Sequence, residues 1–137
     1  MKDREERVSG VRSLWDQLRD RFGYHVVATN ALALLFLSWI PGVHMIRTGI
    51  LSGHAEHVIA YGLSGVLTVA MLAERHAAWW IAAALVAYSF ILELGQMFVP
   101  GRHAAFEDFF FSSAGAAVGV IACAMLRWLV TLRGLRE

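Results

Sequence analysis

Side chains that can exchange protons recur in three short stretches of this 137-residue chain. His57 lies in the first stretch, Glu93 in the second and Asp108 in the third. Histidine titrates near neutral pH, and a carboxylate can transfer a proton or orient an imidazole. These three residues are therefore predicted to be the catalytic residues if the protein performs acid–base chemistry.

A second group of polar residues near the first is predicted to bind a ligand. Arginine suits a phosphate or carboxylate group because its guanidinium can donate two parallel hydrogen bonds. The predicted ligand-binding residues are Arg102, Gln96, Tyr61, His54, His103 and Ser112. Residues three or four positions apart share one face of a helix. The pairs with this spacing are His57 with Tyr61, Glu93 with Gln96, and Asp108 with Ser112.

A metal site is a further option that these residue types raise. The three histidines at 54, 57 and 103, together with Glu93 and Asp108, are of types that bind zinc. However, the chain has no His-Glu-x-x-His motif, and His54-x-x-His57 alone is a weak signal. Neither a metal nor another cofactor is predicted.

The composition indicates the surroundings in which these residues must be positioned. Hydrophobic residues make up 58% of the chain and charged residues 17%, and the mean hydropathy is +0.54. An average soluble chain is about 25% charged, and a small soluble domain cannot bury this much apolar surface. Lipid can solvate the excess. The net charge of +1 says nothing about nucleic acid, but the chain has no long basic run, and no nucleic-acid partner is predicted.

Four apolar stretches are long enough to cross a bilayer as helices. They run over residues 24–40, 55–73, 77–99 and 105–130, and Pro-Gly pairs end the first and third. Asn30 is predicted to bond to a neighbouring helix, and Gly115 and Gly119 to let another helix approach closely. The predicted fold is an all-α integral membrane protein, a bundle of four transmembrane helices.

The N-terminal segment differs from the rest of the chain because it is strongly charged. Apolar residues spaced by three and four predict a short amphipathic helix that precedes the bundle; they are Val8, Val11, Trp15, Leu18 and Phe22. Such a helix would lie on the membrane or contact a partner or second copy. The predicted division is a cytoplasmic N-terminal segment 1–23, a transmembrane domain 24–130 and a basic tail 131–137.

The distribution of lysine and arginine predicts the orientation in a bacterial inner membrane. With both termini in the cytoplasm, ten of the twelve basic residues lie inside and only Arg47 and Arg102 outside. This topology places most of the polar residues named above at the outer ends of the helices. The predicted outer cluster is His44, Arg47, His54, Glu56, His57, Glu93, Gln96, Arg102, His103, Glu107 and Asp108.

Several of these residues occur in a pattern that resembles the VanZ-like membrane protein family. The pattern is His57-x-x-x-Tyr61-x-Leu63, then Glu93-x-x-Gln96-x-x-Val99-Pro100-Gly101-Arg102, then Asp108 followed by Gly115 and Gly119. The resemblance covers roughly residues 30–130. Two positions depart from it: Gly53-His54 stands where the family has Asp-Lys, and Ser112 where it has Asn.

The resemblance implies a bacterial cell-envelope protein with a link to antibiotic resistance. The family takes its name from a protein that confers low-level resistance to the glycopeptide teicoplanin. Two functions remain open. The polar cluster binds a membrane lipid or a lipid-linked or anionic envelope precursor, or it forms an enzyme in which His57 and Glu93 exchange protons with a lipid-linked phosphate substrate.

Overall fold

The structure is a computed structural model that describes residues 2–41, 52–73 and 76–134. Four α-helices account for nearly all of them: α1 (Lys2–Trp39), α2 (Gly53–Leu72), α3 (Ala78–Gln96) and α4 (Phe106–Gly134). Each contains a stretch long and apolar enough to cross a membrane: Leu14–Trp39, Gly53–Leu72, Ala78–Gln96 and Phe106–Arg133. The predicted all-α class with four candidate membrane spans is confirmed.

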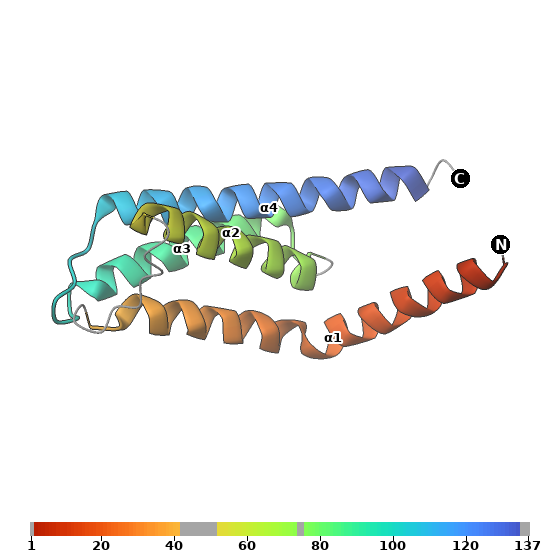
Figure 1. Cartoon of the computed structure of the whole chain (residues 1–137), viewed down its shortest axis with the longest axis horizontal. Coiled ribbons are helices and arrows are strands. Elements are labelled where there is room, and N and C mark those ends of the chain that lie inside the picture. The colour runs from red at the N-terminus through yellow and green to blue at the C-terminus, as the bar shows by residue number, and fades with distance from the viewer. Residues whose placement is uncertain (1, 42–51, 74–75, 135–137) are drawn as a thin grey trace.

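The predicted separate amphipathic helix at the N-terminus is wrong. Residues 2–39 form one continuous helix, in which the charged segment leads directly into the first candidate span. The segment contains no proline, and Gly23 is the only helix-weakening residue near the expected boundary. A single glycine costs a helix only about 1 kcal/mol relative to alanine. Figure 1 shows that α1 bends between its red and orange parts instead of ending there.

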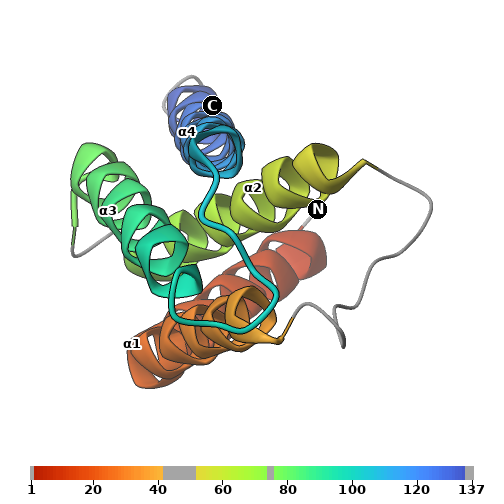
Figure 2. The same ribbon diagram turned by 90° about the vertical axis from the view of Figure 1, so that its left-hand side faces the viewer.

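The helices run alternately up and down, so that α1 and α3 end where α2 and α4 begin (Figure 1). Among the described residues, α1 and α4 each pack against α2 and α3 but not against each other. Figure 2 accordingly shows α1 and α4 on opposite sides of the bundle. The C-terminal ends of α1 and α3 and the N-terminal ends of α2 and α4 therefore lie on the side away from the termini.

The polarity of the bundle is the reverse of that of a soluble protein. Large apolar side chains face outward, including Phe36 at 68% exposure and Leu63 at 66%. Among the residues that the structure describes, six polar or charged side chains are buried inside: Ser64, Thr68, Ser89, Glu93, Gln96 and Ser112. An apolar exterior matches lipid, and buried polar side chains can bond between helices. This arrangement supports a multi-pass membrane protein.

Glycines bring α2 and α4 into close contact beside the polar cluster. A Cβ atom on Gly115 would overlap the backbone oxygen of Val58, and one on Gly119 would overlap that of Gly62. The predicted close approach at Gly115 and Gly119 is confirmed, and α2 is the helix that approaches. Since Val58 follows His57 directly, the distance between these two helices also sets the geometry of the site.

Local sequence signals fix the helix ends that surround the site. The Ser52 hydroxyl accepts a hydrogen bond of 3.3 Å from the backbone amide of Ala55, so Ser52 caps α2. Beyond α3, the Arg102 amide donates to the Val99 carbonyl at 3.1 Å, and Gly101 has a φ of 74°. This turn has a proline and then a left-handed glycine at its centre, as in a type II turn.

Candidate functional site

The three predicted catalytic residues come together although they lie on different helices. His57 is on α2, Glu93 on α3 and Asp108 on α4. One ligand atom from each lies within 4.8 Å of the corresponding atoms of the other two. Of the predicted outer cluster, His44 and Arg47 lie outside the described residues.

The imidazole of His57 is held from both sides by residues of α4. Its Nδ1 atom is 2.9 Å from the hydroxyl oxygen of Ser112, which is fully buried. Its Nε2 atom lies 3.8 Å from Oδ2 of Asp108. When Nδ1 carries the proton, it donates to Ser112 and leaves Nε2 with a lone pair toward Asp108. Ser112 therefore fixes the orientation of the His57 ring.

His54 lies one turn before His57 and completes a pair of imidazoles around Asp108. Its Nε2 atom is 3.7 Å from the second carboxylate oxygen of Asp108 and 3.5 Å from Glu107. Its ring stacks on Phe111, with the ring centroids 4.5 Å apart. Asp108 thus faces one imidazole with each oxygen, whereas His54 itself is more exposed than His57.

Glu93 is the most unusual residue of the site because it is a buried carboxylate with an oxygen that lacks a partner. The residue is 6% exposed. Its Oε1 atom accepts a 3.4 Å hydrogen bond from Gln96, and the backbone amide of Ala105 lies nearby. Its Oε2 atom is buried without a hydrogen-bond partner among the described residues. Leaving a buried polar atom unpaired is costly, so such an atom points to a missing partner.

Gln96 and Arg102 link the site to α1, a role that sequence reasoning did not foresee. Gln96 donates to the Ser38 hydroxyl at 2.9 Å. Arg102 donates to the backbone carbonyls of Leu37, Ser38 and Ile40 at 3.0, 3.0 and 3.2 Å. These carbonyls lie at the C-terminal end of α1, where a cation is favoured. Ser38 is a residue of this network that the sequence did not indicate, and its only sequence signal is its position near the end of a span.

Arg102 and His103 also line an apolar cavity of about 510 Å³ beside Glu93. Large side chains that form its wall are exposed on the outside of the bundle: Leu94 at 45%, Met97 at 65% and Phe106 at 86%. The cavity is therefore lined both by ionisable residues and by apolar side chains whose exposed surfaces would face lipid. The remaining lining residues are Phe90, Ala104, Ala105 and Phe109.

Tyr61 lies on the inner side of the cluster, one turn after His57. It is 5% exposed, and its hydroxyl interacts with the side chain of Ser112. Of the predicted ligand-binding residues, Tyr61, Ser112 and His54 therefore surround His57 and Asp108. The other three, Gln96, Arg102 and His103, lie toward Glu93 and α1.

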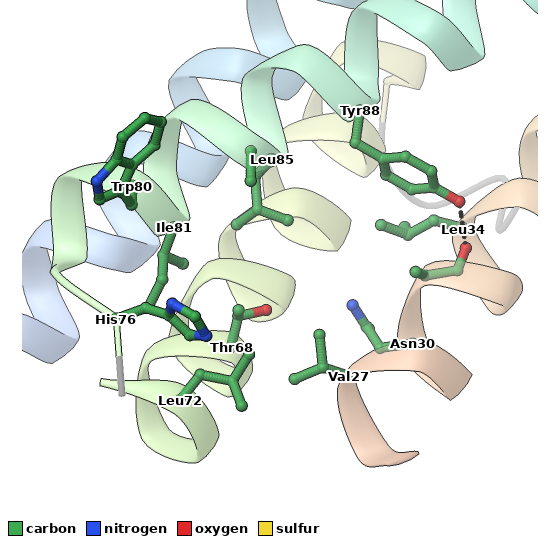
Figure 3. Close-up of a pocket in the computed structure, with 12 residues that line it drawn as sticks. Val27, Asn30, Leu34, Thr68, Leu72, His76, Trp80, Ile81, Leu85 and Tyr88 are labelled. Atoms are coloured by element: carbon green, nitrogen blue, oxygen red, sulfur yellow. Dashed lines mark hydrogen bonds between the residues drawn. The ribbon is translucent and has the colours of Figure 1, made fainter. Parts of the chain in front are cut away.

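A second cavity, of about 560 Å³, lies between α1, α2 and α3 (Figure 3). Its wall includes Leu34, Thr68 and His76, and the Tyr88 hydroxyl at its edge donates to the Ala31 carbonyl at 2.6 Å. Nearby, the Ser64 hydroxyl donates to Asn30 Oδ1 at 3.2 Å, which confirms the predicted bond from Asn30 to a neighbouring helix. None of the three predicted catalytic residues lines this cavity.

Comparisons with known proteins place the chain in a family by sequence. No curated protein and no solved structure matches it. The model of the VanZ/LLP1 family matches residues 13–127, a range that contains all four candidate spans except the last residues of α4. With the helices, the buried Glu93 and the motif around Arg102 in place, this match shows that the chain belongs to the VanZ/LLP1 family.

Proposed function

We propose that this VanZ-family protein binds a lipid-linked or anionic ligand of the bacterial cell envelope at the outer end of its helices. The cavity beside Glu93 carries the proposal. Its apolar lining suits a lipid tail, and its other half consists of ionisable residues that include Arg102 and His103. A ligand with a long apolar tail and a phosphate head matches both halves.

The charge distribution of the chain supports the orientation that this function needs. The turn between α3 and α4, which contains Arg102, must lie outside the cytoplasm for the site to face the envelope. In the sequence, ten of the twelve lysines and arginines come before the first span, between the second and third spans, or toward the C-terminal end after the fourth span begins, as expected for cytoplasmic segments. From the resemblance to the VanZ-like family, we also propose a role in the response to teicoplanin.

Ligand binding can be tested with the purified full chain in detergent. The probe is undecaprenyl phosphate, and the matched neutral control is undecaprenol, which has the same tail without the charge. We expect native mass spectrometry to detect the phosphate form at a concentration at least about tenfold below that needed for the alcohol, since a buried charged hydrogen bond contributes about 1.5–3 kcal/mol. Inorganic phosphate alone should bind far more weakly, because it lacks the tail.

A variant that fills the cavity separates specific binding from detergent-like association. Leu94→Trp places an indole in the cavity, and Leu63→Trp makes the same change on an outward face of α2 that does not line it. Only Leu94→Trp should lose binding of undecaprenyl phosphate. In a teicoplanin-susceptible host, only this variant should also lose any protection that the natural chain gives. Equal binding of both lipids, or equal binding by both variants, would contradict the proposal.

An enzyme is the second candidate, and the orientation of His57 favours it. Ser112 fixes the ring so that Nε2 faces Asp108, with Glu93 close by, as general acid–base catalysis requires. The test is release of phosphate from undecaprenyl diphosphate. Release by the natural chain that is lost in His57→Gln, while lipid binding persists, would establish catalysis, and no release would leave binding as the function.

A further inference from the structure

We infer that His57, Glu93 and Asp108 form a binding site for a divalent transition-metal ion, for which zinc is the probe. One imidazole and two carboxylates are ligands that zinc accepts. They reach a common point from three helices, with one atom of each within 4.8 Å of the others. This inference does not depend on the envelope ligand proposed above.

The distances between the candidate ligand atoms are close to those of a bound ion. Two ligands of a tetrahedral zinc ion lie roughly 3.4 Å apart, given bond lengths of about 2.0–2.1 Å. His57 Nε2 and Asp108 Oδ2 are 3.8 Å apart, and one ligand atom of each of the three residues lies within 4.8 Å of those of the other two. Side-chain rotations that move each ligand atom by about 1 Å or less would bring all three atoms within bonding distance of one zinc ion.

The unpartnered oxygen of Glu93 is the independent sign that something is missing from this cluster. The residue is 94% buried, and Gln96 already bonds to its other oxygen. The described part of the chain supplies no hydrogen bond to Oε2. Arg102 lies close enough to interact with Glu93 electrostatically, and its Nε and Nη2 atoms donate to carbonyls at the end of α1. A cation between Glu93 and Asp108 would offset both carboxylate charges.

The surroundings of the three residues match those of a metal site in two further respects. A metal-binding histidine usually bonds through its second nitrogen to an outer partner, and Ser112 holds Nδ1 of His57 at 2.9 Å. Gln96 similarly holds the Glu93 carboxylate. Three protein ligands also leave a coordination position open, as in zinc sites that bind a further molecule.

Zinc binding is measured on the full chain, purified in detergent with a non-histidine tag and stripped with a chelator. We expect one zinc ion per chain in competition with a chromophoric chelator, and Co²⁺ in its place should give visible d–d absorption. Glu93→Gln and Asp108→Asn should each weaken zinc binding by more than about 100-fold. Ser112→Ala should weaken it by about 10–100-fold, as loss of an outer partner does.

Glu107→Gln is the matched control because it removes one carboxylate next to Asp108, from a side chain that is 77% exposed. It should bind zinc as the natural chain does. Zinc should also raise the unfolding temperature of the natural chain and of Glu107→Gln but not that of Glu93→Gln. The same measurement without zinc shows whether each variant is folded. Failure of the natural chain to bind zinc, or equal binding by Glu93→Gln and Glu107→Gln, would overturn the inference.

Discussion

Gly115→Ala tests whether the close contact of α2 with α4 builds the site. Gly115 faces Val58, the residue after His57, and lies one turn beyond Ser112 on α4. The added methyl group should push the two helices apart at the point where His57 contacts Ser112 and Asp108. The variant should therefore lose stability and distort the site together.

The size of the effect follows from the distances. A Cβ atom on Gly115 would lie 2.8 Å from Cα of Val58 and 3.0 Å from its carbonyl carbon. Non-bonded carbons prefer about 3.5–4.0 Å, so the helices must move apart by roughly 1 Å. Overpacking costs about 1–3 kcal/mol, and loss of the hydrogen bond between His57 and Ser112 costs about 1 kcal/mol. Alanine stabilises a helix by about 1 kcal/mol relative to glycine, which offsets part of this loss. The expected net loss is about 1–3 kcal/mol.

Reversible unfolding of the purified protein in mixed micelles measures this loss. Gly62→Ala is the matched control, because a Cβ atom there would lie an ordinary 3.5 Å from the carbonyl oxygen of Gly115. It should be neutral or stabilising by up to about 1 kcal/mol. If Gly115→Ala is as stable as Gly62→Ala, α2 and α4 are not held in this close contact and the site geometry derived from it is wrong.

Three other substitutions test the contacts that tie α1 and the α3–α4 turn to the bundle. Arg102→Ala should lower the free energy of unfolding by about 1.5–3 kcal/mol, because the last carbonyls of α1 lose their hydrogen bonds. Arg102→Lys should be intermediate in stability. Equal stability of both variants and the natural chain would contradict the capping role. A double-mutant cycle of Asn30→Ala and Ser64→Ala should give a coupling of about 0.6 kcal/mol, whereas a coupling of zero would exclude the bond. Gly101→Ala should lower the unfolding temperature, because an alanine at a φ of 74° destabilises the turn by about 1–2 kcal/mol. An unchanged unfolding temperature would argue against the left-handed turn.

The four helices and the meeting of His57, Glu93 and Asp108 could be predicted because each follows from a simple constraint. A bilayer requires about 20 apolar residues per helix, and short connections make neighbouring helices antiparallel. The end of the third span and the starts of the second and fourth must then lie together. Glu93, His57 and Asp108 occupy those ends, so their proximity needed no knowledge of side-chain packing.

Features that depend on which helices touch could not be predicted in the same way. The Gly115 and Gly119 pair indicated a close neighbour, but nothing in the sequence identified it as α2. Arg102 was expected to hold a ligand, whereas its hydrogen bonds to α1 depend on where that helix ends relative to the α3–α4 turn. The continuity of α1 across Gly23 could not be predicted either, because the composition changes there while the helix does not end.

Site-directed labelling of two connecting segments tests the central claim, that the polar cluster faces outward. In a Cys123→Ala background, His103→Cys marks the turn between α3 and α4, and His76→Cys marks the opposite end of the bundle; both positions are exposed. A membrane-impermeant maleimide should label residue 103 in intact spheroplasts and residue 76 only after the membrane is permeabilised. The reverse pattern would place the cluster in the cytoplasm and contradict the proposed envelope function.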